Sequence, residues 1–292
     1  MLVLRLVRFA RALSMGALAI LIWPPGLEGQ AILAPGGRTL FNQQVLVRSF
    51  SRIDRRTVLR DGGTVSMRRY IQPVAVVYGF APGWHATAVT PFVVGERTGR
   101  GDSRFFVKYD GLVKRNEPGG LTRLAAEFGV QAPTGSDGFS TEAMSYLGDL
   151  VFLKASKQRH IVADVQYEAA TRNSDGVTIG NRALFDVALA YLFLPETAKS
   201  RSAKASGLGK LAPHGLFGLV EFNAEVRNRA RDRIGALPNS GGGLLYISPG
   251  MQYFMKRNLI LELSVPIPVV RKLNGIQAKP QTGVVFGFRY VL

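Results

Sequence analysis

The final ten residues, 283–292, read GVVFGFRYVL and alternate between two kinds of side chain. Large apolar or aromatic side chains occupy every second position, at Val284, Phe286, Phe288, Tyr290 and Leu292. The positions between them carry glycine, valine and Arg289. A period of two places alternate side chains on opposite faces of a β-strand. The segment therefore predicts a strand with one large apolar face, and the fold has to give that face an apolar environment.

The same period of two recurs from Phe41 onward, in segments separated by clusters of Gly, Pro, Asn and Asp. Segments of about ten residues with this alternation are typical of a transmembrane β-barrel, in which lipid-facing and lumen-facing residues alternate. We expect strands at 41–53, 69–80, 84–94, 104–115, 121–132, 143–155, 160–171, 183–194, 215–226, 243–254, 259–267 and 283–292. The predicted fold is all-β, an antiparallel transmembrane β-barrel of about twelve strands over residues 32–292.

The expected connections fall into two length classes. The short ones are 81–83, 116–120, 156–158 and 255–258, and the long ones are 54–67, 95–102, 133–142, 172–182, 227–242 and 268–282. Bacterial barrels have short periplasmic turns and longer external loops, and an even number of strands leaves both termini in the periplasm. The connection 195–213 is the exception, because it is long but belongs to the periplasmic side. A soluble β-sandwich or propeller has the same strand periodicity, and the alternation of loop lengths favours the membrane barrel.

Residues 1–31 have the features of a cleaved secretory signal peptide. Three arginines precede an apolar run at 12–23, and residues 29–31 read GQA, a small-x-small pattern typical of a cleavage site. A retained membrane anchor is the alternative, but a spanning helix needs roughly 20 apolar residues. We therefore expect export and a location in the bacterial outer membrane.

Composition limits the partners of the chain. It has no cysteine, which excludes disulfides and thiolate metal sites. Its net charge of +17 favours anionic partners. No nucleic-acid-binding motif accompanies this charge, so lipopolysaccharide or an anionic solute is expected in place of nucleic acid.

Short motifs resemble one family of outer-membrane proteins. The segments that carry the resemblance are YGF at 78–80, TPFV at 90–93, GVQAPTG at 129–135, and SPGMQY at 248–253 with Arg257-Asn258. Together with the aromatic terminal strand they are similar to the MetA-pathway phenol-degradation family, whose members are called transporters. The resemblance implies a β-barrel that passes small, aromatic or hydrophobic molecules. The terminal Phe286, Phe288, Tyr290 and Leu292 also resemble the signal by which the barrel-assembly machinery recognises its substrates.

The alternation assigns charged side chains to the lumen. The lumen candidates are Arg48, Arg69, Lys108, Asp110, Arg123, Glu127, Asp149, Asp164, Glu168, Asp186, Glu221, Glu225, Glu262 and Arg289. Early strands supply mostly Arg and Lys and later strands mostly Asp and Glu, so two walls of opposite sign are expected. These charges act either as a selectivity filter or as ion pairs that only stiffen the barrel.

A second basic group, Arg227, Arg229, Arg231 and Arg233, alternates through the 227–242 loop. One interpretation is an external strip that binds lipopolysaccharide phosphates, because arginine pairs well with phosphate. The other is a solvated loop face.

The sequence offers no catalytic constellation. Its three histidines, His85, His160 and His214, are scattered. His160 shares a strand face with Asp164 and Glu168, but four residues along a strand separate side chains by about 13 Å. This distance is too large for a local triad. We predict no catalytic residue, no metal site and no cofactor. The expected function is an outer-membrane channel for small molecules. The alternatives are a closed structural or lipopolysaccharide-contacting barrel and, less favoured, an envelope hydrolase.

Overall fold

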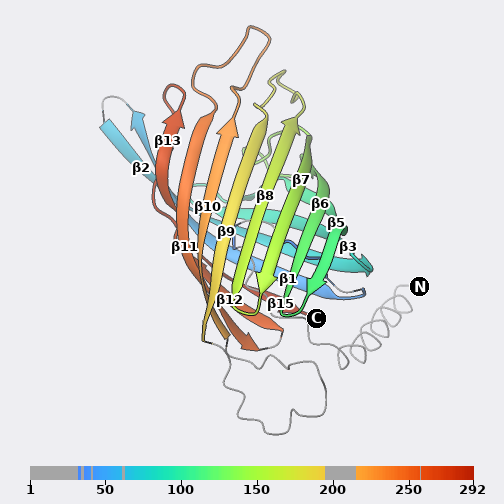
Figure 1. Cartoon of the computed structure of the whole chain (residues 1–292). Helices are drawn as coiled ribbons and strands as arrows, with labels where there is room; N and C mark the ends of the chain where they lie inside the picture. The colour runs from blue at the N-terminus through green and yellow to red at the C-terminus, as the bar shows by residue number, and fades with distance from the viewer. Residues whose placement is uncertain (1–31, 34–35, 41, 61–62, 195–214, 257) are drawn as a thin grey trace, which may run out of the picture.

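The computed structural model describes residues 32–33, 36–40, 42–60, 63–194, 215–256 and 258–292. They form a closed, antiparallel β-barrel of twelve strands (Figure 1). The expected signal peptide and the 195–213 connection lie outside the described residues, so both remain predictions.

Ten strands are continuous. They are β1 (Val45–Arg60), β2 (Gly63–Ala81), β3 (Trp84–Val94), β5 (Ser103–Glu117), β6 (Gly120–Ala132), β7 (Ser145–Ser156), β8 (Arg159–Ala170), β9 (Arg182–Leu194), β10 (Gly215–Arg227) and β11 (Gly242–Lys256). The short β4 (Gly99–Arg100) pairs with β3 just ahead of β5.

The last two strands are interrupted. β12 (Leu259–Ser264) and β13 (Ile267–Leu273) both pair with β11 and are two halves of one strand, separated by Val265 and Pro266. Proline has no N–H to donate to the sheet, which accounts for the break. β14 (Lys279–Pro280) and β15 (Val284–Val291) both pair with β1 and make up the twelfth strand.

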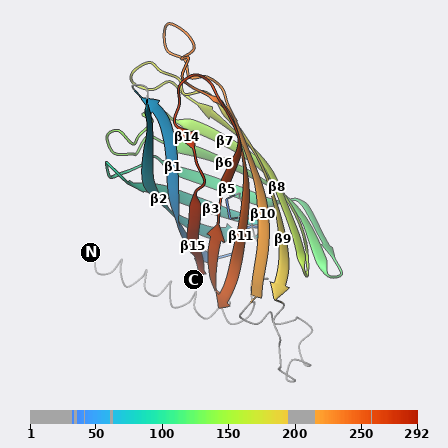
Figure 2. The same cartoon turned by 90° about the vertical axis from the view of Figure 1, so that its left-hand side faces the viewer.

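Each strand pairs with its neighbour in sequence, and the terminal strand closes the ring against the first. β15 lies between β12 and β1, with Leu46 opposite Val291 and Ile53 opposite Val284 (Figure 2). Closure satisfies the backbone groups that a free edge strand would leave unpaired.

The twelve predicted strands are confirmed, with two corrections. The long loop expected at 54–67 is wrong, because β1 and β2 continue as a hairpin to Arg60 and from Gly63, projecting past the rest of the barrel (Figure 1). The loop expected at 268–282 begins too early, since β13 runs to Leu273. Both segments are rich in charge and therefore read as loops, yet cross-strand backbone hydrogen bonding does not depend on side-chain polarity.

The outer surface of the barrel is apolar. Large apolar side chains are exposed along the long strands β2, β3 and β5 to β11, among them Phe128, which is 70% exposed, and Phe193, which is 61% exposed. Monomeric soluble proteins rarely expose a contiguous apolar surface of this extent to water. In a lipid bilayer the same surface contacts acyl chains, so the free-energy cost of exposing it to water is removed. Among the described residues there is no helix long and apolar enough to cross a membrane.

The interior is apolar near the short turns and charged above them. One apolar cluster comprises Ala125, Val151, Leu153, Ala155, Val162 and Ala188. A second comprises Ile32, Ala190, Leu192, Phe217, Leu219, Phe254 and Val285. Buried acids and bases occupy the inward positions beyond these clusters, and they are the candidates for function.

Candidate functional site

The described residues ahead of β1 lie in the lumen. Glu221 on β10 accepts hydrogen bonds from the backbone N–H of Ile32 and, at 3.0 Å, of Leu33. Arg48 on β1 donates to the carbonyl oxygen of Ile32. Glu221 is fully buried, so these residues are held by a carboxylate on one strand and a guanidinium on another. We call the described residues 32–33 and 36–40 the lumen segment.

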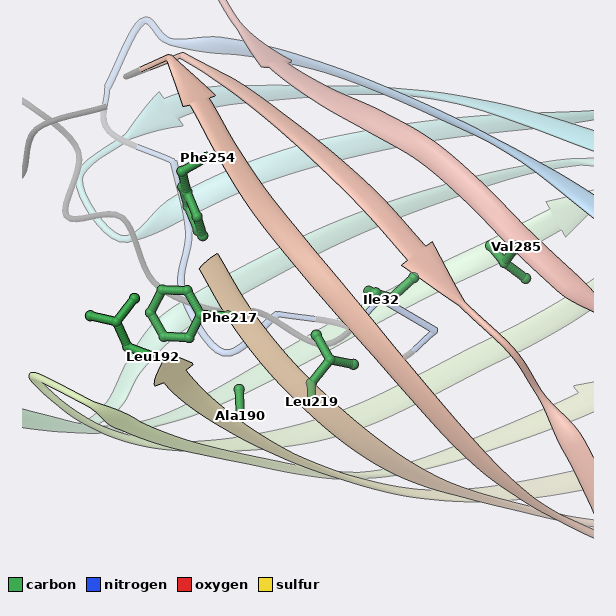
Figure 3. Packing of buried hydrophobic residues seen from close by; sticks show 7 residues of the cluster. All are labelled: Ile32, Ala190, Leu192, Phe217, Leu219, Phe254 and Val285. Atoms are coloured by element: carbon green, nitrogen blue, oxygen red, sulfur yellow. The ribbon is translucent and has the colours of Figure 1, made fainter. Parts of the chain in front are cut away.

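Ile32 anchors this segment in the second apolar cluster. The side chain is 1% exposed and packs with residues of β9, β10, β11 and β15, which Figure 3 shows around it. Burying an isoleucine side chain contributes roughly 1.5–3 kcal/mol. Leu33 packs against the same cluster from the side, and the other described contacts of the segment with the barrel wall are mainly polar.

Further contacts carry the lumen segment across to the opposite strands. Lys108 Nζ on β5 donates to the carbonyl oxygen of Gly36 at 2.9 Å. The backbone N–H and hydroxyl of Thr39 donate to Asp110 at 3.1 and 2.9 Å. The N–H of Leu40 reaches His85 Nδ1 on β3 at 3.4 Å. The chain then pairs with Gly79 through Gln43 before β1 begins.

A close approach to β7 explains one glycine. A Cβ atom on Gly37 would lie 2.3 Å from the Cβ of Leu153, which is closer than real contacts allow. The residue pattern did not predict a segment inside the lumen. The signal for it is a short, Pro- and Gly-containing stretch ahead of the first strand, which by itself is typical of any linker.

The inner wall at β1, β12 and β15 is basic, and its acids are paired. Glu262 accepts from Arg289 at 2.7 Å and from Arg48 at 3.1 Å, and Gln252 donates to it at 2.7 Å. Higher on the same wall, Asp54 accepts from Arg56 at 2.9 Å and Arg69 at 2.8 Å. We call this the basic wall, because each of these two carboxylates is paired with two arginines.

The inner wall at β7, β8 and β9 is acidic. Asp149, Asp164 and Asp186 face inward and are buried. No arginine or lysine forms an ion pair with any of the three among the described residues. β8 is six strands from β1 in the ring of twelve, so this acidic wall faces the basic wall across the lumen.

The end of the lumen with the long loops has mixed pairs. Glu168 on β8 lies 3.5 Å from Arg104 and also pairs with Arg182. Glu225 on β10 pairs with Arg227 at 3.2 Å and lies 4.0 Å from Arg182. This mouth network links β5, β8, β9 and β10.

The structure places most of the predicted lumen residues inside the barrel. The following residues are buried and point inward: Lys108, Asp110, Arg123, Glu127, Asp149, Asp164, Asp186, Glu221, Glu262 and Arg289. Three more, Arg48, Glu168 and Glu225, are partly buried. Arg69 is different, because β2 is exposed on both faces from Gly63 to Tyr70. Arg123 caps the short-turn end, donating to the carbonyl oxygens of Arg115 and Thr122 and to Asn116.

The predicted basic strip divides into two parts. Arg227 belongs to β10 and to the mouth network, whereas Arg229, Arg231 and Arg233 are exposed in the loop. The backbone of Arg231 pairs with that of Thr178, which joins this loop to the 171–181 loop. A turn at 173–176 orders the second loop, with Gly176 at a φ of 78°.

The terminal aromatic face lies outside the barrel. Phe286, Phe288, Tyr290 and Leu292 are all exposed on the outer surface of the last strand. Their role as an insertion signal remains a prediction.

The two described histidines have structural partners. His85 binds the lumen segment, and the Nε2 of His160 lies 2.9 Å from the carbonyl oxygen of Ser156, with its ring 5.1 Å from that of Phe217. The structure brings neither of them into a nucleophile–base pair or a metal cluster of described residues.

Comparison with solved structures places this barrel among outer-membrane proteins in fold. The chain is similar to the COG4313 outer membrane channel from Pseudomonas putida F1, with a TM-score of 0.68 and 11% identity, over 89% of this chain and 100% of that one. It is less similar to the NanC porin, with a TM-score of 0.48 and 12% identity over 82% and 98% of the two chains. The KdgM porin in complex with disordered oligogalacturonate has a TM-score of 0.42 and 10% identity over 82% and 98%. No family model and no curated protein matches the chain.

Proposed function

We propose that the chain is an outer-membrane channel for small solutes, narrowed by its own lumen segment. The observation that carries this proposal is the interior of the barrel: charged walls of opposite sign, with a peptide segment between them that is held largely by hydrogen bonds. An apolar outer surface fits the protein for a bilayer. The channel performs no chemistry on its solute.

The charged interior supports transport over a purely structural role. A barrel that only fills the membrane gains most from a packed apolar core, because burying charge is costly even when the charge is paired. Here apolar packing is concentrated towards the short turns, and the middle and the mouth are polar. Selectivity in channels comes from such rings of charged side chains and from the width of the path.

The lumen segment sets the width of the path. Its apolar anchor is Ile32, with Leu33 beside it, and its contacts further along are mainly hydrogen bonds, among them those with Glu221, Arg48, Lys108 and Asp110. Hydrogen bonds to charged groups contribute about 1.5–3 kcal/mol each. None of these bonds belongs to the strand pairing of the barrel, so the segment can be displaced without unfolding the barrel.

The likeness to the COG4313 outer membrane channel supports a channel, and the resemblance to the MetA-pathway family supports small, aromatic or hydrophobic solutes. Two partners follow from the outer surface. The barrel-assembly machinery would recognise the strand that ends at Leu292, and lipopolysaccharide phosphates would bind Arg229, Arg231 and Arg233.

A second candidate is a closed structural barrel. The specific observation in its favour is the lumen segment itself, which contacts strands on several sides of the interior. Conduction separates the two candidates.

The test is single-channel conductance of the refolded chain in planar bilayers, compared with a variant that lacks residues 32–40. We expect small steps from the full chain and steps several-fold larger from the deletion variant. Ile276→Ser, at an exposed loop position, is the matched control and should conduct like the parent. A folded deletion variant that gives no steps would overturn the channel proposal in favour of the closed barrel.

A cross-link tests the same proposal without deleting any residue. The chain contains no cysteine, so Ile32→Cys with Leu219→Cys can be joined by a short bifunctional thiol reagent within their shared cluster. The cross-linked double variant should show only the small conductance steps. Without the cross-link, the same variant should also show occasional larger steps. Identical traces before and after cross-linking would mean that the segment does not move during conduction.

A further inference from the structure

Three carboxylates are adjacent on the acidic wall. Asp164 on β8 lies directly opposite Asp186 on β9. Asp164 is also opposite Val151 on β7, which makes Asp149 its diagonal neighbour on that strand. Directly opposed residues have Cβ atoms about 4.5–5.5 Å apart and diagonal ones about 7–8 Å. All three side chains point inward, so the carboxylates share one small region of the lumen.

Asp149 and Asp164 are each only 4% exposed. Neither oxygen of Asp164 has a hydrogen-bond partner among the described residues, and the oxygens of Asp149 have none from a side chain. Asp186 accepts one hydrogen bond, from Asn223 at 2.8 Å. Buried carboxylates are normally matched by donors or cations, so this wall has acceptor capacity that the protein does not fill.

The nearest charged groups do not supply the missing cation. Lys108 is held at 2.9 Å by Glu127 and at 2.9 Å by the carbonyl oxygen of Gly36. Glu127 is opposite Asp149 and adds a further negative charge to the region. Directly opposed like charges destabilise a sheet, and Asp164 and Asp186 are such a pair. A cation between them would remove this cost.

We propose that Asp149, Asp164 and Asp186 form a binding site for a small ammonium group, such as a protonated primary amine. Its single positive charge and its N–H donors can be shared among neighbouring carboxylates. A metal ion is not favoured, because no group of three acidic or histidine side chains in the described part of the chain is arranged to hold one. The site itself needs only the barrel. That the cation is also a permeating solute rests on the proposed function.

Cation-dependent thermal stability tests the site without any conduction. The chain is refolded in detergent, and its unfolding midpoint is measured in chloride salts of sodium, ammonium, methylammonium and tetramethylammonium at equal ionic strength. A ligand that binds only the folded state raises the midpoint as it saturates. We expect a saturable rise of about 2–4 °C with ammonium or methylammonium. We expect none with sodium, which has no N–H donors, and none with tetramethylammonium, which has no N–H donors and is too large for the site.

A saturable rise with sodium as large as that with the two ammonium salts would overturn the assignment to an ammonium group. Asp149→Asn with Asp164→Asn should abolish the saturable rise, because the amides keep the shape and lose the charge. Glu142→Gln, an exposed position in the 133–144 loop, is the matched control and should keep the rise. An equal response of the parent and the double variant, or an equal effect of tetramethylammonium, would overturn the proposal and leave general ionic screening.

A second measurement connects the site to transport. In a bilayer with a salt gradient, the double variant should show a several-fold lower ratio of cation to anion permeability than the parent. A saturable thermal rise in a barrel that does not conduct would keep the cation site and reject the channel. A conducting barrel whose permeability ratio and midpoint are both unaffected by the double substitution would keep the channel and reject the site.

Discussion

The basic and acidic walls of the lumen are built from the same side-chain types in opposite ways. On the basic wall, Glu262 and Asp54 each bind two arginines. On the acidic wall, three aspartates share no arginine or lysine within ion-pair distance in the described residues. The first arrangement is self-sufficient and stabilises the closure of β1 against β15. The second is incomplete without an external cation, which is why we assign it to a ligand.

Strand position accounts for this difference. The basic wall contains the junction of the first and last strands, where Arg48 lies directly opposite Arg289. Two arginines on adjacent strands repel, and Glu262 on the next strand neutralises them through two ion pairs. The acidic wall lies in the middle of the chain, where consecutive hairpins hold the strands together. Repulsion between Asp164 and Asp186 can therefore be tolerated there.

The largest effect should come from breaking the basic wall. Glu262→Leu leaves Arg48 and Arg289 buried without their shared carboxylate, and removing one partner of a buried ion pair typically costs about 3–5 kcal/mol. Urea unfolding of the refolded barrel should show a loss of stability of that size. Glu96→Gln, an exposed loop position, should be unchanged. A loss below about 1 kcal/mol, the range of surface pairs, would mean that water already screens this wall.

Lys108 joins Glu127, beside the acidic wall, to the lumen segment. Lys108→Met should cost about 2–3 kcal/mol, because Glu127 loses its ion pair and Gly36 loses its donor. The same variant should increase conductance, since the lumen segment is held less tightly. Unchanged stability with unchanged conductance would remove Lys108 from both roles.

Asp102 gives a third case, a carboxylate held by neutral donors. It lies between β4 and β5, where Thr141 donates from its hydroxyl and its backbone N–H, at 2.6 and 2.8 Å, and Gly135 donates at 3.0 Å. Burial by itself raises the pKa of Asp102, but these hydrogen bonds hold the pKa below its usual value. Because the folded pKa is depressed, the stabilisation is present above the unfolded pKa of about 3.9 and is lost as the pH falls through the folded pKa.

Amide hydrogen exchange of Gly135 and Thr141, corrected for intrinsic rates, should therefore show protection that decreases below about pH 4. Asp102→Asn should lower this protection at neutral pH by roughly 1–2 kcal/mol and abolish the decrease at acid pH. Protection that is constant down to pH 2 in the parent would contradict the assignment.

The smallest effect, with the opposite sign, is expected on the acidic wall. Asp164→Asn removes the repulsion with Asp186 and should change stability by less than about 1 kcal/mol, towards stabilisation, in buffer without small cations. Asp54→Asn on the basic wall is the matched comparison and should destabilise. A loss of several kcal/mol on Asp164→Asn would show that the carboxylate has a structural partner and that the two walls are alike.

Much of the architecture was predictable from the order of residue types. Phe286, Phe288 and Tyr290 lie on the outer face as expected, and the strand ends agree within a few residues over most of the barrel, because side-chain alternation is a local property. The hairpin at 54–67 was missed because arginine-rich stretches have no apolar face. The lumen candidates were found from the alternation of side chains along each strand. This alternation specifies the face on which a side chain lies but not its neighbours on other strands.

By itself, then, the sequence determined the number of strands, the face of the residues in most of them and the presence of charge of both signs in the lumen. Only the tertiary structure decided which charges are paired. It placed Glu262 between Arg48 and Arg289, left Asp164 beside Asp186, and brought Leu33 of the lumen segment to Glu221. The physical reason is that periodicity arises within a strand, whereas pairing and burial depend on the register between strands and on closure of the ring. Closure brings together residues as far apart in sequence as Leu46 and Val291.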